Sequence, residues 1–285
     1  MTMKTVGVVG SGLMGSGIAE VAACNGFEVV LRSRTQAQAD IAVGRVATSL
    51  GKAVEKGKLD AAGRDEAVDR LRGTADLGAL ELCDLVIESV VEDLGTKQAL
   101  FRDLDRTCAP DALLATNTST LPVVEMAMAT GRPDRVVGLH FFNPAPRMPL
   151  VEIVPALTTS PATVAAARAF AQVCGKEPVT VKDKAGFIVN ALLFPYLNSA
   201  VHMLDSGVAT REDIDTAMKG GCGFPMGPLE LLDLVGLDTS VAILNALNAE
   251  EPSGCTAPAP LLKRMVAAQH LGRKTGRGFY PYPDR

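Results

Sequence analysis

The chain has 285 residues, of which 47% are hydrophobic and 21% charged, and its formal net charge is −4. This length and composition fit a globular protein with a large core and one or two domains. No apolar run approaches the roughly 20 residues that span a bilayer, and a glycine-rich turn stands where a signal peptide would be apolar. We therefore expect a cytoplasmic protein with no membrane partner, and the acidic balance argues against a nucleic-acid partner.

The six cysteines show no C-x-x-C spacing, which argues against a zinc site and against a disulfide framework. We expect them to be reduced packing residues, and we expect no metal site. They are Cys24, Cys83, Cys108, Cys174, Cys222 and Cys255.

In the first 184 residues, short apolar runs alternate with helical periods. This order requires crossover connections, so it predicts an α/β fold with a mostly parallel sheet. The predicted helices cover residues 12–24, 35–58, 95–107 and about 161–174. The predicted strands are "TVGVVG", "FEVVL", "CDLVIES", "ALLATN", "VVGLHFF", "LVEIVP" and "EPVTVKD".

The pattern changes after Lys184. From Gly186 onward the sequence shows helical patterns without a convincing strand, and the proline-rich stretch at 250–260 is typical of a loop. We therefore expect a domain boundary near 184–186, with an α/β domain over 1–184 and an all-helical domain over 185–285.

The segment Gly10-Ser11-Gly12-Leu13-Met14-Gly15 follows the first predicted strand and opens the first predicted helix. In that position Gly10 makes the tight turn, Gly12 lets a pyrophosphate approach the backbone, and Gly15 permits close packing of helix against strand. The motif is weak when isolated, and a plain glycine-rich turn is the alternative. Its place inside a strand-helix-strand pattern favours a bound dinucleotide and a Rossmann-type domain.

The second predicted strand ends in "LRSRT", without the acidic residue that accepts the ribose hydroxyls of NAD. Ser33 stands at that position. A carboxylate would repel the 2′-phosphate of NADP, whereas Ser33 can donate to it and Arg32 and Arg34 can bind it with charge-assisted bonds. We therefore expect NADP(H) to be favoured, with NAD(H) still possible. The alternative is that both arginines are merely solvated at a strand end.

His140 lies at the end of "VVGLH", at the carboxyl end of a buried strand, where open α/β sheets bind ligands. Glu152 follows in the apolar strand "LVEIVP", where a carboxylate is costly unless it is paired. An imidazole is the natural partner, and the carboxylate would fix its tautomer, so we expect the two to form a general acid/base pair. The alternatives are a core histidine and an exposed glutamate on an edge strand.

These residues and their surroundings resemble those of the 3-hydroxyacyl-CoA dehydrogenases, particularly the short bacterial 3-hydroxybutyryl-CoA dehydrogenases. The resemblance covers nearly the whole chain. It rests on "GSGLMGSGIAEVAA", "VIESVVEDLGTKQALF", "ATNTST", "GLHFFNPAPRMPLVEIVPALTTS", "DKAGFIVNALLFPYLNSA", "DIDTAMKGGCGFPMGPLELLDLVGLDT" and "LGRKTGRGFY".

The resemblance implies an enzyme of fatty acid metabolism that forms a homodimer through its helical domain. It implies the reversible oxidation of a short-chain (S)-3-hydroxyacyl-CoA such as 3-hydroxybutyryl-CoA to a 3-oxoacyl-CoA such as acetoacetyl-CoA. In that reaction His140 takes the hydroxyl proton and Glu152 orients it. Ser119 and Asn190 match polar residues that hydrogen-bond the substrate oxygen. Without the resemblance, a helix cap and a polar residue at a helix start are the alternatives for these two.

The resemblance also assigns residues to the cofactor and to CoA. Ser49 and Lys56 fall where the family contacts CoA. Independently, Ser49, Lys52 and Lys56 share one helix face by their i, i+3, i+7 spacing, which suits phosphates, although a solvated helix face is the alternative. The residues that match cofactor-lining positions are Glu92, Lys97, Asn117, Ser119, Asn143 and Lys274.

Three departures from the family pattern stand beside the match. Ser33 replaces the aspartate of the NAD-using members, which puts their coenzyme preference in doubt here. Ala191 replaces a common arginine, so that a contact near the substrate or the domain hinge is lost. Arg147 adds a basic residue that either touches CoA or lies in solvent.

Two other functions stay open from the sequence. One is a reductase of a 3-oxo thioester carried by an acyl carrier protein in secondary metabolism. The other is a non-catalytic NADP-binding protein that retains the fold as a sensor or structural protein. A binding protein needs neither His140 nor Glu152, and their presence favours the dehydrogenase.

Overall fold

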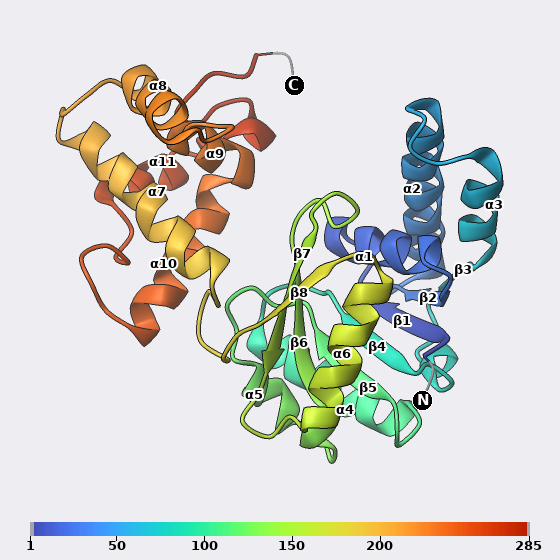
Figure 1. Cartoon of the computed structure of the whole chain (residues 1–285). Helices are drawn as coiled ribbons and strands as arrows, with labels where there is room; N and C mark the ends of the chain where they lie inside the picture. The colour runs from blue at the N-terminus through green and yellow to red at the C-terminus, as the bar shows by residue number, and fades with distance from the viewer. Residues whose placement is uncertain (1–2, 284–285) are drawn as a thin grey trace. The chain divides into compact units, whose positions relative to one another are not determined.

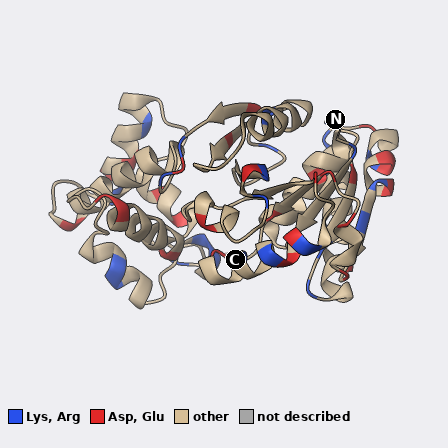
Figure 2. Cartoon of the chain, turned by 90° about the horizontal axis from the view of Figure 1, so that it is seen from below, with Lys and Arg blue, Asp and Glu red and all other residues tan. Residues whose placement is uncertain are grey.

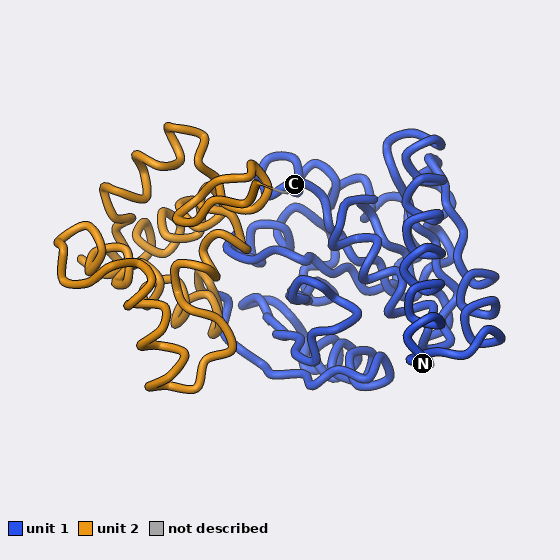
Figure 3. Tube along the Cα trace, turned by 90° about the horizontal axis from the view of Figure 1, so that it is seen from above, with its two compact units in different colours: residues 1–183 blue, residues 184–285 orange. Residues whose placement is uncertain are grey.

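The computed structural model describes residues 3–283, and the chain divides into two compact units. Unit 1 comprises residues 1–183 and unit 2 comprises residues 184–285 (Figure 3). The boundary expected from the sequence, between 184 and 185, lies one residue later.

Unit 1 is built on an eight-stranded sheet with the order β3-β2-β1-β4-β5-β6-β7-β8 (Figure 1). The first six strands are parallel, β7 runs antiparallel to β6, and β8 is parallel to β7. The predicted mostly parallel sheet is therefore confirmed. The strands are β1 (Thr5–Val9), β2 (Glu28–Arg32), β3 (Leu71–Thr74), β4 (Leu85–Glu88), β5 (Leu113–Thr116), β6 (Val136–Phe141), β7 (Leu150–Pro155) and β8 (Glu177–Thr180).

Helices cover both faces of this sheet. Val6 in β1 belongs to a core cluster that α1, α2 and α6 share. On the other face, a Cβ added to Gly7 would lie 2.7 Å from Leu80, and one added to Gly138 in β6 would lie 3.0 Å from Val123 in α5. The helices are α1 (Leu13–Cys24), α2 (Gln36–Glu55), α3 (Ala61–Asp69), α4 (Leu94–Thr107), α5 (Val123–Ala127) and α6 (Pro161–Val173), with 3₁₀ turns at Gly78–Leu80 and Pro133–Arg135.

The sequence interpretation missed α3 and β3. The helix α3 buries only Ala67, and the strand β3 has two buried residues out of four, so neither shows a clear apolar period. β3 forms by pairing with β2 at the edge of the sheet, which is a tertiary contact rather than a local preference.

The regular secondary structure of unit 2, among its described residues, is helical, apart from isolated β-bridges near Gly272 and Arg277. The stretch from Leu229 through residue 247 lies in the region predicted to be helical and forms two helices, because Gly236 between them adopts φ 103°, which an L side chain rarely tolerates. The helices are α7 (Val189–Asp205), α8 (Arg211–Cys222), α9 (Pro228–Val235), α10 (Leu237–Glu250) and α11 (Pro260–Ala267), with a 3₁₀ turn at Arg273–Thr275.

Positions of Lys and Arg are interspersed with those of Asp and Glu along the chain (Figure 2). Among residues 3–283, no helix combines the length and apolarity needed to cross a membrane. All six cysteines are free thiols. The expectation that all six pack in the interior is wrong for Cys24, Cys222 and Cys255, which are exposed.

Candidate active site

The sheet places His140 and Glu152 directly opposite each other. They are register partners in the antiparallel pair β6 and β7, and His140 Nδ1 lies 2.7 Å from Glu152 Oε2. Both are buried, with 6% and 0% of their surfaces exposed. The ring of Phe142 lies 4.5 Å from the imidazole, centroid to centroid. A buried carboxylate on Nδ1 holds the ring in one orientation and stabilises its protonated form, as a general acid/base requires.

Asn117 ties three neighbouring strand ends together. Its Oδ1 accepts from the N–H of Phe141 at the end of β6, and its Nδ2 donates to Ser89 Oγ just after β4, at 2.9 Å and 3.3 Å. Asn117 itself follows β5. The carboxyl ends of β4, β5 and β6 therefore meet at one edge of the sheet, where open α/β proteins bind their ligands.

At this edge, Glu92 holds the turn that carries Ser119. Glu92 Oε1 accepts from Thr118 Oγ1 at 2.6 Å, from the N–H of Ser119 at 2.8 Å and from Ser119 Oγ at 3.3 Å. Burial raises the pKa of the Glu92 carboxyl, but the Lys97 ammonium and these hydrogen bonds outweigh it and keep that pKa below its ordinary value. Glu92 is therefore an anion, and Ser119 is held at the carboxyl end of β5.

Lys97 is fully buried and does not offer its ammonium to the surface. Its Nζ lies 2.7 Å and 2.8 Å from the two carboxylate oxygens of Glu88 and 3.2 Å from Glu92 Oε2. The resemblance placed Lys97 against the cofactor. Lys97 is buried and contacts Glu92, and its assignment to the cofactor remains a prediction.

The glycine-rich loop between β1 and α1 has the shape that a pyrophosphate needs. A Cβ at Gly10, where φ is 121°, would lie 2.2 Å from the carbonyl oxygen of Ser89, and one at Gly15 would lie 1.9 Å from that of Gly10. A Cβ at Gly12 would meet no atom within 4 Å. No side chain caps the N-terminus of α1, which begins after Gly12. Backbone N–H groups at a helix start with open space before them fit a dinucleotide phosphate.

The end of β2 differs from its expected chemistry in one respect. Ser33 is 4% exposed, its Oγ lies 2.6 Å from Ser11 Oγ, and it donates to Gln38 Oε1 at 3.3 Å. The hydroxyl is therefore engaged with the glycine-rich loop and with α2. Arg34 is exposed, and half-buried Arg32 donates to the carbonyl of Ala75 at 3.4 Å.

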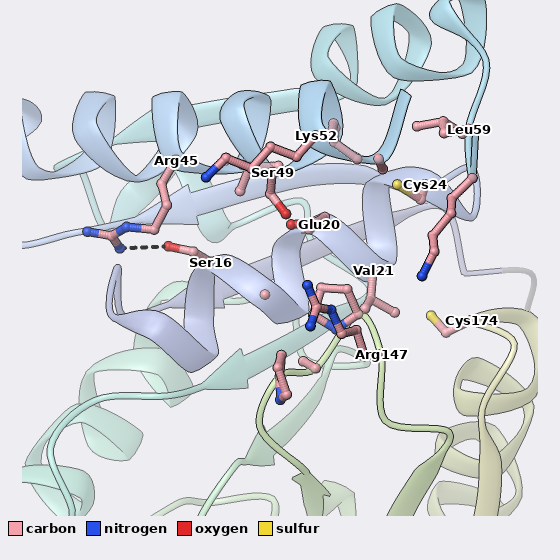
Figure 4. A pocket seen from close by; sticks show the side chains of 18 of the residues that line it. Ser16, Glu20, Val21, Cys24, Arg45, Ser49, Lys52, Leu59, Arg147 and Cys174 are labelled. Atoms are coloured by element: carbon pink, nitrogen blue, oxygen red, sulfur yellow. Dashed lines mark hydrogen bonds between the residues drawn. The ribbon is translucent and has the colours of Figure 1, made fainter. Parts of the chain in front are cut away.

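A cavity of about 780 Å³ opens between α1, α2 and the loop after β6. Ser49, Lys52 and Lys56 all line it, together with Glu20 of α1 and Arg147 of the loop (Figure 4). The spacing on α2 thus brings the three expected residues to one cavity. Burial raises the pKa of the Glu20 carboxyl above its ordinary value, while a hydrogen bond from Ser49 and the charge of Arg147 oppose that rise.

The same cavity contains Asn143, which the resemblance assigned to the cofactor. Arg45 also lines the cavity, and its Nη1 donates to the carbonyl of Ser11 at 2.9 Å and to Ser16 Oγ at 3.2 Å. Lys176 donates to the carbonyls of Ala145 and Met148, which fixes the loop that carries Arg147.

Two family models match the chain in tandem. The 3-hydroxyacyl-CoA dehydrogenase NAD binding domain matches residues 5–184, and the 3-hydroxyacyl-CoA dehydrogenase C-terminal domain matches residues 186–282. The chain belongs to the 3-hydroxyacyl-CoA dehydrogenase family. Its first unit is the NAD binding domain of that family, which takes a nicotinamide cofactor.

Relatives in this family match over nearly their whole length. A 3-hydroxybutyryl-CoA dehydrogenase of Mycobacterium tuberculosis is 49% identical over 282 residues, covering 98% of this chain and 99% of that protein. One of Clostridioides difficile is 45% identical, covering 96% and 98%. The crystal structure of (S)-3-hydroxybutyryl-CoA dehydrogenase PaaH1 from Ralstonia eutropha matches with a TM-score of 0.96 and 41% identity, covering 99% of this chain and 100% of that one.

Two residues that the resemblance assigned to the substrate or the cofactor lie in unit 2. Asn190 is 8% exposed in the first turn of α7. Lys274 lies in a short turn near the end of the chain, and its Nζ is 2.6 Å from both carboxylate oxygens of Asp238. The assignment of Asn190 to the substrate and of Lys274 to the cofactor remain predictions.

The sequence interpretation missed Glu88, Glu20 and Arg45. Glu88 had a usable signal, because it ends the apolar strand "LVIE" and an unpaired carboxylate there is as costly as one at Glu152. Glu20 and Arg45 had no such signal, since each lies in a helix whose orientation only the folded chain defines.

Proposed function

We propose that this chain is a dehydrogenase of short-chain (S)-3-hydroxyacyl-CoA esters such as 3-hydroxybutyryl-CoA, acting reversibly. The observation that carries the proposal is the 2.7 Å contact of His140 Nδ1 with Glu152 Oε2 in a chain of this family. The test is an initial-rate measurement with acetoacetyl-CoA and NADPH or NADH, and with (S)-3-hydroxybutyryl-CoA in reverse. Absence of coenzyme-dependent turnover with both esters would refute it.

His140 is the general acid/base of this reaction. The bound coenzyme supplies a hydride acceptor for C3 of the alcohol, or a hydride donor for the ketone. Because Nδ1 donates to Glu152, the lone pair of the neutral ring is on Nε2, and that nitrogen takes the proton of the substrate hydroxyl. Glu152 then stabilises the imidazolium, and in the reverse direction His140 returns the proton to the forming alcohol.

Ser119 and Asn190 hydrogen-bond the substrate oxygen in this proposal. Ser119 is suited to this because its turn is fixed by Glu92 at the edge of the sheet. Removal of one such donor from an oxygen that gains negative charge costs about 10²-fold in rate or more. Ser119→Ala should therefore lower kcat by at least about this factor.

The cavity beside α2 binds the CoA part of the substrate. Among the six cations that line it, Lys52, Lys56 and Arg147 suit the phosphates of CoA, with Ser49 as a neutral donor. Lys56→Ala and Arg147→Ala should each raise KM for acetoacetyl-CoA several-fold, because each removes one charged contact with the substrate. KM for the coenzyme should stay unchanged. Arg72→Ala, an exposed arginine on β3, is the control. An unchanged KM in both cavity variants would contradict this placement.

The coenzyme favoured in this proposal is NADPH. Unit 1 has Ser33 rather than a carboxylate at the end of β2, and exposed Arg34 and half-buried Arg32 flank it. Since the Ser33 hydroxyl is engaged by Ser11 and Gln38, the two guanidinium groups rather than Ser33 supply the main contacts with a 2′-phosphate.

A further inference from the structure

Three charged side chains form a connected group next to Ser119, and the reaction described above does not use them. Glu88 ends β4, Lys97 lies in α4, and Glu92 lies in the loop between them. The side chains of Glu88 and Lys97 are 0% exposed, and that of Glu92 is 34% exposed. We propose that Glu88 is a positioning residue that acts on Ser119 through Lys97 and Glu92. This inference rests on the proposed function, because it assigns Ser119 to the substrate oxygen.

Three residues donate hydrogen bonds to the carboxyl group of Glu88. Its Oε1 accepts from the N–H of Val90 at 2.6 Å and from Lys97 Nζ at 2.7 Å, and its Oε2 accepts from Lys97 Nζ at 2.8 Å and from Thr116 Oγ1 at 2.7 Å. β4 and β5 both contribute to this arrangement. A buried carboxyl group with four hydrogen bonds is held in one position.

Lys97 links Glu88 to Glu92 through its ammonium group. Its ammonium has three protons, and three carboxylate oxygens lie within reach: two of Glu88 and Glu92 Oε2 at 3.2 Å. With two of its bonds fixed by Glu88, the third can point only toward Glu92.

Glu92 in turn determines where Ser119 lies. Its Oε1 accepts from Thr118 Oγ1, from the N–H groups of Ser119 and Thr120, and from Ser119 Oγ. The two N–H bonds fix the main chain and the rotamer of Ser119, and so the position of its Oγ, while the long 3.3 Å contact lets the hydroxyl proton turn to the substrate oxygen when the substrate binds. A misplacement of about 1 Å at a reacting centre can cost about 10²-fold in rate, so the anchor of this rotamer matters for kcat.

The variant Glu88→Gln tests the inference. It keeps the shape of the side chain but presents an amide to the ammonium, so Lys97 turns toward Glu92 and draws it from Ser119. We expect kcat to fall about tenfold, with KM for acetoacetyl-CoA within about twofold of wild type.

A double-mutant cycle with Ser119→Ala separates positioning from general destabilisation. If Glu88 acts through Ser119, the tenfold effect of Glu88→Gln on kcat shrinks to less than about twofold in the Ser119→Ala background. The same factor in both backgrounds, or no effect of Glu88→Gln on kcat, would overturn the inference. Wild-type turnover and its decrease in Ser119→Ala are measured first, so a failure of the proposed function is seen separately, and that failure would overturn this inference too.

Two further variants keep the test interpretable. If Glu88→Gln does not fold, Glu88→Gln combined with Lys97→Met removes both buried charges at similar volume, and the same cycle and outcomes apply. The matched control is Asp105→Asn, which breaks the partly buried ion pair of Asp105 with Arg132, 2.7 Å long, before β6. It should lower the melting temperature but leave kcat unchanged in both backgrounds.

Discussion

His140 and Glu152 occupy opposed positions on two antiparallel strands, and their side chains meet at 2.7 Å in a buried setting. Opposed residues on one face of an antiparallel pair have neighbouring Cβ atoms, so the strand register alone brings the imidazole and the carboxylate together. A slip by one residue would turn one of the two side chains to the other face of the sheet. The acid/base pair therefore depends on the sheet and not on a flexible loop.

The first prediction concerns this pair. His140→Gln should lower kcat by about 10²- to 10⁴-fold, because it removes the proton acceptor and keeps a side chain of similar size. Coenzyme binding, measured by fluorescence titration, should change little. Glu152→Gln should lower kcat by a smaller factor, since the ring remains but its protonated form loses its carboxylate. Wild-type kcat in His140→Gln would remove His140 from its proposed role.

The pair could be predicted from sequence because each member violates the apolar pattern of a buried strand. The same reasoning applied to Glu88 would have predicted that it is buried. It would not have predicted its partner Lys97, because Lys97 lies in a helix and the pattern of a strand does not define which residue of a helix faces it. The direction of the Ser33 hydroxyl could not be predicted from the sequence either, because it depends on contacts with Ser11 and Gln38.

The elements of the fold also differ in whether the sequence alone could predict them. Strands with continuous apolar runs, such as β4 and β6, and helices with a regular apolar face were predictable. The edge strand β3 was not, because it gains its structure from pairing with β2. The break at Gly236 was also missed, since a glycine within an apolar helical run indicates a kink only when its φ is known.

A second prediction uses the raised pKa of Glu20. Because burial raises that pKa above its unfolded value, ionisation of Glu20 destabilises the folded chain. The penalty is absent below the unfolded pKa and complete above the folded one. Glu20→Gln removes it, so the unfolding free energy of the variant relative to wild type should be greater at about pH 7 than at about pH 4. Urea denaturation at the two pH values measures this difference.

Asp93→Asn is the matched control for that experiment, with the opposite sign. Hydrogen bonds from the side chain and the N–H of Thr96 lower the pKa of Asp93, which caps α4. Its stabilisation is present above the unfolded pKa and is lost as the pH falls through the folded pKa. The variant should therefore lose stability relative to wild type at neutral pH and approach it in acid. The same pH trend for both variants would contradict the assignment for Glu20.

A third prediction concerns assembly. Unit 2 exposes several large apolar side chains that a solvated surface does not favour, so we expect a homodimer formed through this unit. Light scattering at micromolar concentration should give twice the mass of the chain, which is 29.8 kDa. A monomeric mass would refute the prediction. The most exposed of these side chains are Leu192, Met203, Val208, Phe224 and Leu234.

The last prediction concerns the coenzyme. A 2′-phosphate carries close to two negative charges, and a well-made contact from each of Arg32 and Arg34 is worth roughly 1.5 to 3 kcal/mol. Solvent and salt reduce this, so kcat/KM should favour NADPH over NADH by about tenfold to a few hundredfold. Ser33→Asp combined with Arg34→Gln should invert the preference, because it adds an acceptor for the ribose hydroxyls and removes one cation.

The aspartate in that double variant would also repel the 2′-phosphate directly, so the loss should appear mainly in KM for NADPH. Arg102→Gln, an exposed arginine of α4, removes the same charge elsewhere in unit 1 and should leave the ratio unchanged. Both coenzymes are compared at fixed ionic strength, because added salt weakens the phosphate contacts selectively. A wild-type ratio of one, or a preference for NADH, would mean that Arg32 and Arg34 are only solvated residues at a strand end.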